Sequence, residues 1–201
     1  MYQMWDEHGG YQFMLKNRRE QENTGRPIPQ VNEEYGYEDH YPGRWGEGRK
    51  WPARSADNRR RLAWEMAMAG CYQTTGERAN EPGYGGWING RGNAKMTMLK
   101  GYAHIRRFFE RMEWWKLEPH PELVREGQAL CLAQPPGQYV FYLPKGGSIF
   151  PAVDAPRYKA RWFNPRSGDF ARVLDIGSAF KNPIAIAPDK EDWVLLLEKR
   201  H

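Results

Sequence analysis

Four acidic side chains fall within seven positions of the segment 29–42, namely Glu33, Glu34, Glu38 and Asp39. A short apolar stretch leads into them, and a loop rich in Tyr and Gly follows. Carboxylates crowded in this way repel one another, so a packed protein holds them together mainly where they have a task. The pattern predicts a strand whose C-terminal end presents a catalytic carboxylate, as in α/β barrels. A solvated acidic loop is the alternative interpretation.

Glycoside hydrolysis is the chemistry that fits such a carboxylate, because two acidic groups flank the bond that is cleaved. Glu34 and Glu33 are alternative candidates for one of them. Their side chains leave a strand on opposite faces, so only one can point into a barrel mouth. Asn32 shares a face with Glu34 and could bind a sugar hydroxyl. Glu77, after the next predicted strand, could be a second carboxylate or pair with an arginine.

Other kinds of site find little support. His40 follows Glu38 and Asp39, but neither an HxH nor an HExxH spacing occurs, so no metal site is predicted. Nucleotide-binding glycine motifs and the nucleophile elbow are also missing, and no cofactor is expected. Cys71 and Cys131 lie sixty positions apart, and both are expected to be buried and free.

Composition indicates a globular protein of 201 residues, with 40% hydrophobic and 27% charged residues. Nine Trp offer flat surfaces for stacking on sugars. The net charge of +5 permits weak attraction to polyanions, and the basic loop 43–61, which carries Trp45 and Trp51, could bind nucleic acid. A long loop over an active site is the favoured interpretation. Nucleic acid is therefore not a predicted partner. No apolar run is long enough for a membrane helix, so a membrane is not predicted either. The N-terminus lacks signal-peptide features, and the cellular compartment stays open.

The front half of the chain reads as alternating strands and helices. A short helix-like piece over 11–16 precedes a loop over 17–27 and the acidic strand. Asp57 or Asn58 can cap a helix that Gly70 helps to end, and a strand over 72–75 follows. After the loop 78–95, an apolar stripe predicts a further helix, with Met98, Tyr102, Ile105, Phe109 and Met112 at spacings of three and four. This order predicts about two parallel βα units.

The back half changes to a period of two, which indicates short strands separated by Pro- and Gly-rich turns. Such a series is typical of a β-sandwich, and the boundary falls near 117–127. Two βα units cannot close a barrel of eight strands, so the chain is expected to be a piece of a longer protein. The predicted strands are 128–133, 138–143, 148–153, 159–164, 171–176, 184–187 and 193–197.

Several motifs in order resemble the last part of the apiosidase-like glycoside hydrolases. They are the acidic segment 32–38, the helix 60–70, and Phe108-Phe109 leading to Trp114-Trp115. The segments 139–147, 160–168 and 192–197 are similar to the C-terminal domain of that family, which carries a collagen-binding label. The resemblance covers nearly the whole chain, and the ordered set is more specific than any single motif.

The resemblance implies a partial (β/α)8 barrel over residues 1–118, followed by an antiparallel β-sandwich over 119–201. It places the nucleophile on Glu34, with Glu33 as the fallback, and Tyr37 and Glu38 in the same pocket; Trp87 is a further candidate for substrate binding. The family's acid/base carboxylate lies on an earlier strand that this chain lacks.

The expectation is therefore the C-terminal part of a retaining hydrolase acting on a polysaccharide or other glycan, inactive alone, whose full-length relatives are secreted or periplasmic. A non-catalytic module that binds carbohydrate or collagen is the alternative, and collagen rests on the family label alone.

Overall fold

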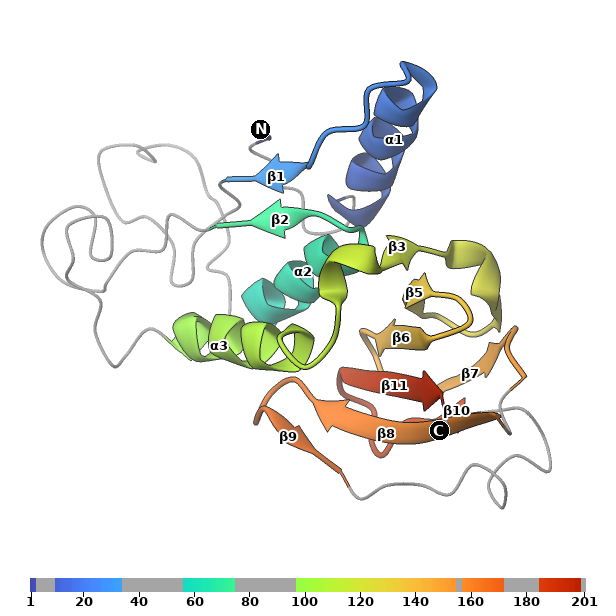
Figure 1. Cartoon of the computed structure of the whole chain (residues 1–201). Helices are drawn as coiled ribbons and strands as arrows, with labels where there is room; N and C mark the ends of the chain where they lie inside the picture. Colours follow the sequence, from blue (N-terminus) through green and yellow to red (C-terminus); the bar gives the residue numbers. More distant parts are fainter. Residues whose placement is uncertain (3–9, 34–55, 75–96, 155–156, 172–184, 200–201) are drawn as a thin grey trace, which may run out of the picture. The chain divides into compact units, whose positions relative to one another are not determined.

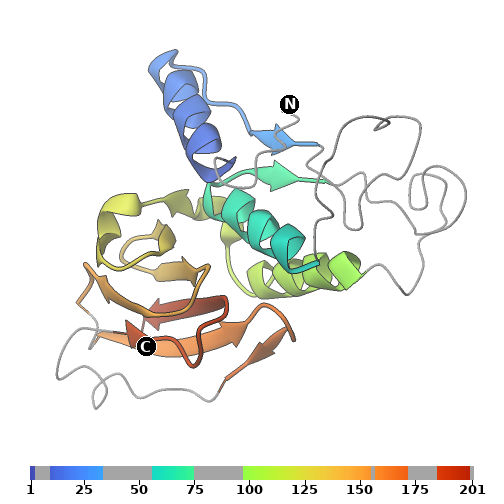
Figure 2. The same cartoon turned by 180° about the vertical axis from the view of Figure 1, so that it is seen from behind.

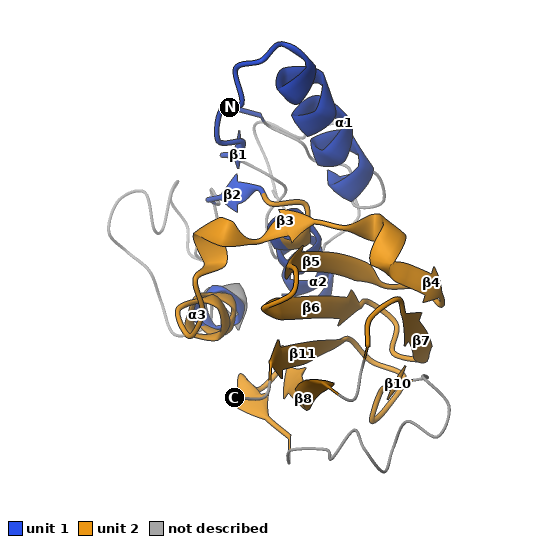
Figure 3. Ribbon diagram, turned by 45° about the vertical axis from the view of Figure 1, so that its right-hand side comes forward, with its two compact units in different colours: residues 1–67, 71–103 blue, residues 68–70, 104–201 orange. Residues whose placement is uncertain are grey.

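The computed structural model describes residues 1–2, 10–33, 56–74, 97–154, 157–171 and 185–199. The chain divides into two compact units, residues 1–67 with 71–103 and residues 68–70 with 104–201 (Figure 3). Helices and parallel strands make up the described part of the first unit, whereas antiparallel sheets dominate the second. The fold is thus mixed α/β with a sheet-rich C-terminal part, which confirms the predicted class in this general form.

The first unit is built on a strand–helix–strand crossover. Its elements are α1 (Gly10–Asn23), β1 (Val31–Asn32), α2 (Ala56–Met68), β2 (Tyr72–Gln73) and the first half of α3 (Thr97–Phe109). β1 and β2 pair in parallel, with Val31 opposite Tyr72 and Asn32 opposite Gln73. Figure 1 shows the two arrows running in the same direction, and Figure 2 shows the pair from behind. Parallel neighbours joined by a helix are what the alternating sequence pattern predicted.

Helix α1 is longer than the sequence predicted. The interpretation of 17–27 as a loop is wrong up to Asn23, because the helix continues through this polar stretch. Ion pairs at the i,i+4 spacing link Lys16 to Glu20 at 3.8 Å and Arg18 to Glu22 at 3.0 Å, and such pairs each add a few tenths of a kcal/mol to a helix, roughly 0.2–0.5. The buried side chains of α1 lie in its first half, so polar pairing supports the second.

Helix α2 ends as the sequence predicted and lies close to α1. Gly70 follows it with a φ of 68°, and the Cys71 N–H donates to the Met66 carbonyl at 3.1 Å, which is the bond that closes a Schellman motif. Where α1 meets α2, a Cβ built on Gly10 would lie 2.3 Å from Cε of Met66. A glycine at the start of α1 therefore permits the close approach of α2.

The second unit holds two antiparallel sheets. The larger has the strand order β3-β5-β6-β11-β8-β9, and the smaller has the order β10-β7-β4. Two single 3-10 turns, η1 (Trp114–Lys116) and η2 (Pro121–Leu123), precede and follow β3. The strands are β3 (Glu118–Pro119), β4 (Val124–Glu126), β5 (Leu130–Gln134), β6 (Gln138–Leu143), β7 (Ser148–Pro151), β8 (Tyr158–Asn164), β9 (Asp169–Phe170), β10 (Ala185–Ile186) and β11 (Trp193–Lys199).

One core cluster of this unit gathers alternate residues of the large sheet together with residues of the small sheet. Phe141, Trp162 and Leu195 are members from three adjacent strands, and Ile149 and Ala185 come from the small sheet. The alternation places these side chains on one face of the large sheet, as the period-two pattern predicted.

The second face of the large sheet is apolar in its middle. Six of its side chains are at most 4% exposed, whereas Arg161 and Glu198 at one end of the face form an ion pair and are 34% and 31% exposed. Phe108, at the end of α3, packs against it, with ring centroids 4.9 Å from Phe163 and 5.9 Å from Phe170. The six apolar residues are Leu132, Val140, Tyr142, Phe163, Val194 and Leu196.

The predicted strands of the back half agree well with the described ones. β5 to β8, β10 and β11 overlap predicted strands, and 138–143 is matched at both ends. Two short strands, β3 and β4, and the two-residue β9 were missed because none is long enough to display alternation. Of the predicted strand 171–176, all but Ala171 lies outside the described residues.

Helix α3 also follows the prediction, with one difference. Ile105 and Met112 of the predicted stripe are buried, but Phe109 is only half-buried, whereas Phe108 beside it is fully buried. The contacts of Phe108 with the large sheet explain this difference. Both cysteines are buried and free, as predicted. None of the described helices is long and apolar enough to span a membrane.

Candidate functional site

The C-terminal ends of parallel strands meet at one edge of the first unit. Tyr2 pairs with Asn32 of β1 in parallel, on the side away from β2. The Glu33 N–H donates to the Tyr2 carbonyl at 2.9 Å, and the Thr74 N–H donates to the Asn32 carbonyl at 3.1 Å. The ladder therefore continues through Glu33 and Thr74, and both residues lie at the carboxyl edge of this small sheet, where α/β proteins place their chemistry.

One face of this sheet is turned toward the helices. The Asn32 side chain is fully buried, and its amide nitrogen lies 3.6 Å from the Met66 sulfur of α2. Gln73, its partner on β2, donates to the Ala63 carbonyl of the same helix at 2.7 Å. The Tyr2 ring meets Phe13 of α1 edge-on at 5.4 Å. Side chains of three neighbouring strands thus lie on the helix side.

Gln30, two residues before Asn32, also faces the helices. It is 3% exposed, and with its amide oriented to donate to the Met14 carbonyl at 2.9 Å it accepts from the Arg18 N–H at 2.7 Å. Gln30 and Asn32 are two positions apart, so they share a face of the strand. Buried amides that find partners in this way fix the register between strand and helix, because leaving one unpaired would cost about 1–3 kcal/mol.

The opposite face carries the intervening residues of both strands. Val31 and Glu33 are half-buried, Thr74 is exposed, and Tyr72 is 45% exposed. Since Asn32 faces α2 and the ladder still includes Glu33, the pleat directs the Glu33 side chain away from the helices. An aromatic ring, a hydroxyl and a carboxylate therefore share one accessible face at the carboxyl ends of two parallel strands.

Most of the site residues predicted from the sequence lie outside the described part of the chain. This holds for Glu34, Tyr37, Glu38 and Trp87, and also for Glu77 and His40. Their roles stay predictions.

The two predicted residues that are described lie on different faces. Glu33 lies at the carboxyl edge. Asn32 has a structural partner in α2, and its contact with a substrate remains a prediction. Tyr72 and Thr74 were not predicted as site residues, and their register opposite β1 is the signal that could have found them.

A carboxyl on α2 has an unusual proton affinity. Burial raises the pKa of Glu65 from its ordinary value of 4.5 to about 7. Desolvation has this effect because the charged form loses its hydration. Glu65 was not predicted as a site residue, since nothing in the local sequence pattern distinguishes it from a solvated helix glutamate. Across the described residues, no cluster of three or more His, Cys, Asp or Glu could hold a metal ion.

In the second unit, polar side chains tie neighbouring turns together. Arg166 donates through Nε and its backbone N–H to Asn164 Oδ1, at 3.0 and 2.9 Å, and its guanidinium pairs with Asp189 at 2.9 Å. Trp193 Nε1 also donates to Asp189, at 2.7 Å. Although partial desolvation alone would raise the pKa of Asp189, the hydrogen bonds from Arg166, Trp193 and the Glu191 backbone lower it. These contacts fix turn geometry rather than forming an open site.

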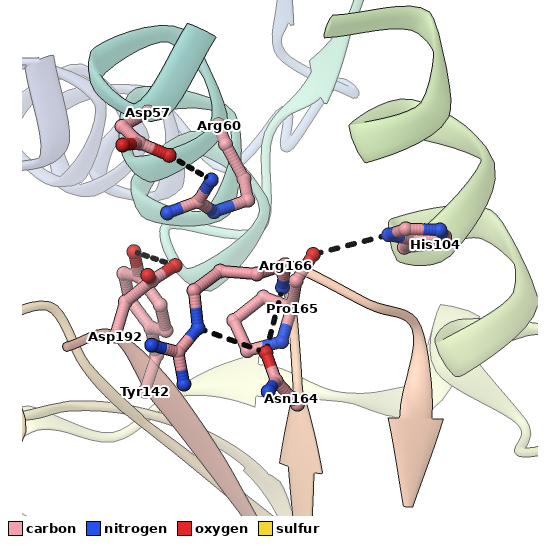
Figure 4. Close-up of polar contacts among 8 residues, drawn as sticks. All are labelled: Asp57, Arg60, His104, Tyr142, Asn164, Pro165, Arg166 and Asp192. Atoms are coloured by element: carbon pink, nitrogen blue, oxygen red, sulfur yellow. Dashed lines mark hydrogen bonds and ion pairs between the residues drawn. The ribbon is translucent and has the colours of Figure 1, made fainter. Parts of the chain in front are cut away.

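The same unit contains two further contacts drawn in Figure 4. His104 Nδ1 lies 3.1 Å from the Pro165 carbonyl, which joins α3 to the β8–β9 turn, and the Tyr142 hydroxyl lies 3.5 Å from Asp192 Oδ2 in a buried position. Within the first unit, Arg60 pairs with Asp57 in the first turns of α2. All of these are structural contacts within their own unit.

Comparison with known proteins gives a family match for the sheet-rich part and a fold match for the chain. The family described as "Putative collagen-binding domain of a collagenase" matches residues 125–198. No curated protein sequence matches the chain.

Among solved structures, a glycoside hydrolase family 5 protein from Bacteroides vulgatus is similar, with a TM-score of 0.68 and 13% identity over 96% of this chain and 45% of that protein. A second structure, described as a glycoside hydrolase, has a TM-score of 0.65 and 14% identity over 92% of this chain and 45% of its own. This chain therefore spans less than half the length of either structure, and the likeness is one of fold.

Proposed function

We propose that this chain is the C-terminal part of a retaining glycoside hydrolase, acting on a polysaccharide once the rest of a (β/α)8 barrel is in place. The observation that carries the proposal is the parallel edge formed by Tyr2, Glu33 and Thr74, with α1 and α2 packed on the face that carries Asn32 and Gln73. In a barrel, the other face of such strands lines the interior, and the residues at their carboxyl ends form the active site. The glycoside hydrolase folds to which the chain is similar support this interpretation.

In this proposal, residues 1–118 supply the last two βα units with a remnant of the sixth, and residues 119–201 form the sandwich. Tyr2 would belong to that remnant, since it pairs with β1 as a preceding strand would. The apiosidase-like resemblance suggests a plant or microbial polysaccharide as substrate. Tyr37, Glu38 and Trp87 would line the sugar pocket, and Tyr72 adds an accessible ring at the same edge.

The nucleophile of the proposed reaction is one of two adjacent glutamates. The family motif favours Glu34. Strand alternation favours Glu33, because Asn32 faces α2 and the next side chain of the ladder points to the opposite, accessible face. Glu33 and Glu34 are consecutive residues, so the proposed reaction class is the same for both assignments.

The mechanism divides between this chain and an upstream carboxylate. The nucleophilic glutamate attacks the anomeric carbon while the upstream acid protonates the leaving oxygen, and water then hydrolyses the glycosyl-enzyme ester. The two carboxyl groups of a retaining pair stand about 5–5.5 Å apart. Alone, the chain would lack the acid and show little or no hydrolysis.

Hydrolysis assays with and without the coding sequence upstream of Met1 test this proposal. We expect aryl glycosides or polysaccharide to be cleaved only when that sequence adds the missing βα units. In the active form, replacing the nucleophile by alanine should remove turnover, and a small anion such as azide should restore it. Azide rescue of Glu33→Ala supports the alternation argument, and rescue of Glu34→Ala supports the motif. Hydrolysis by the 201-residue chain alone would overturn the proposed inactivity.

A second candidate function is supported by the family match at 125–198. The sheet-rich part would then act as a binding module for carbohydrate or collagen, and the front part as its support. Co-sedimentation of the whole chain with insoluble polysaccharide and with fibrillar collagen distinguishes the two ligands. Recovery in neither pellet would remove this candidate.

A further inference from the structure

Two adjacent tryptophans lie on the surface of the second unit. Trp115 is 59% exposed and Trp114 is 38% exposed, and their rings meet edge to face, with centroids 5.8 Å apart. Large aromatic side chains usually bury most of their surface, so two exposed neighbours on one short turn are uncommon. The other large apolar side chains exposed in the described parts are single residues well separated along the chain.

The turn that carries the pair is held at both ends. Met112 before it and Leu117 after it are buried, at 7% and 5% exposure. Within η1, the Lys116 N–H donates to the Glu113 carbonyl at 2.9 Å, and the Leu117 N–H donates to the Trp114 carbonyl at 3.1 Å. The indoles are therefore presented by an anchored backbone, and a ligand would not have to order this segment on binding.

The surroundings of the pair are charged. Lys116 pairs with Glu113 at 2.8 Å, and both side chains are about half exposed. Earlier in the sequence, at the end of α3, Arg106 pairs with Glu110 at 2.6 Å. The centres of protein–protein interfaces are depleted in Lys and Glu, and a standard interface covers roughly 800 Å² on each partner. Two indoles among ion pairs fit a smaller ligand with an apolar face and a polar rim.

We infer that Trp114 and Trp115 form a glycan-binding platform on η1 of the second unit. The C–H face of a pyranose or furanose ring would stack on an indole, and its hydroxyls would reach the Glu113 and Lys116 side chains at the rim. The inference goes beyond the proposed hydrolysis, because a platform of this kind retains a polysaccharide chain whether or not the barrel is complete. Its occupant is a polysaccharide, not collagen or a second protein.

Affinity electrophoresis of the whole chain tests the platform. The gels would contain arabinogalactan, rhamnogalacturonan, xylan or glucomannan, and bovine serum albumin would serve as the non-binding reference. We expect at least one polymer to retard the wild-type chain. The Trp115→Ala change should reduce the retardation at least several-fold, Trp114→Ala/Trp115→Ala should abolish it, and Trp115→Phe should retain part of it.

Ile186 offers a control, since it is another exposed apolar side chain, at 70%, on β10 of the same unit. Ile186→Ala should leave the retardation unchanged. Thermal melts confirm that each variant is folded, since removing an exposed ring should hardly change the melting temperature. Retardation that survives the double Trp change, or absence of retardation by every polymer, overturns the platform. A shift in oligomeric state of the double variant on size exclusion, without any loss of glycan binding, overturns it as well.

These outcomes are distinguishable from those of the proposed hydrolysis. Glu33→Ala and Glu34→Ala should leave the retardation intact, because neither side chain belongs to η1. The Trp changes should in turn leave cleavage of a small aryl glycoside by the completed enzyme unchanged. Failure of one proposal therefore leaves the other standing.

Discussion

Glu65 shows how a single side chain can make the stability of this protein depend on pH. Its carboxyl has a folded-state pKa of about 7, raised from 4.5 by burial. Between these values the unfolded chain ionises while the folded chain stays protonated, so stability falls as pH rises through this range and the loss is complete above pH 7. The loss in the free energy of unfolding is on the order of 1–3 kcal/mol, and the lower end of this range allows for the partial exposure of the carboxyl to solvent.

Replacing this carboxyl by its neutral amide removes the pH-dependent loss. Glu65→Gln should therefore raise the melting temperature relative to wild type at pH 8 and change it little at pH 4. Glu20→Gln, on the exposed part of α1, is the control and should show no such trend. Melting curves at four or five pH values between 4 and 8 give the answer. An equal shift at all pH values would mean that the carboxyl is solvated in the folded protein.

At the residue scale, the sequence predicted the position of a carboxylate at a strand end better than it predicted the face on which each side chain lies. The acidic cluster drew attention to the end of β1, and Glu33 does lie at that edge. Residue spacing alone could not predict which face of the strand meets the helices. Period two separates Asn32 and Glu33, but only the contact of Asn32 with Met66 shows which of them faces the helices.

The turns of the second unit depend on glycines whose surroundings differ sharply. Gly168 and Gly147 both have positive φ, of 77° and 83°. A Cβ on Gly168 would lie 2.5 Å from the His104 ring, whereas a Cβ on Gly147 would meet nothing within 4 Å. The contact between α3 and the β8–β9 turn therefore requires a residue without a side chain at position 168.

Alanine at these two positions separates backbone strain from steric overlap. Both changes force a left-handed backbone on a residue with a side chain, at about 1–2 kcal/mol. Gly168→Ala should cost roughly 1–3 kcal/mol more, because the His104 ring must move. Urea unfolding of the two variants measures the difference. His104→Ala should relieve the overlap. In the His104→Ala background, adding Gly168→Ala should therefore cost only about as much as Gly147→Ala costs in the wild-type protein. If Gly168→Ala costs the same with and without the His104 ring, the overlap is contradicted.

At the scale of elements, the sequence predicted types more reliably than lengths. The four longer strands of the large sheet, β5, β6, β8 and β11, stood out because each spans several alternations, and α3 stood out because its apolar stripe is continuous. The second half of α1 was missed because its support comes from ion pairs on a polar surface, and hydrophobic periodicity is blind to these. The full burial of Phe108 was missed because its partners lie more than fifty residues further along the chain.

The two apolar faces of the large sheet affect how the molecule can be divided. A cut at 118/119 would separate Phe108 from Phe163 and Phe170, and leave the second face without that cover. Burying a phenylalanine contributes about 1.5–3 kcal/mol, so the loss is large for a small domain. The segment 119–201 should therefore bind a hydrophobic dye such as ANS and melt at a lower temperature than the whole chain.

The segment 97–201, which keeps all of α3, should recover part of this stability and bind less dye. Calorimetry and ANS fluorescence on the two segments and the whole chain give the comparison. If 119–201 melts at the same temperature as the whole chain and binds no dye, the second face does not need α3. Phe108→Ala in the whole chain provides an independent measure, with an expected loss of about 3–5 kcal/mol.

The strand order of the large sheet also bears on the speed of folding. Its central pair joins β6 to β11, so Val140 must meet Leu196, which lies more than fifty positions further along the chain. The β5–β6 hairpin, by contrast, closes locally through Gln134 and Gln138. Because long loops close slowly, the hairpin is expected to form first and the central ladder last. β11 therefore completes the middle of the sheet, and until it pairs, both β6 and β8 present open edges to other chains.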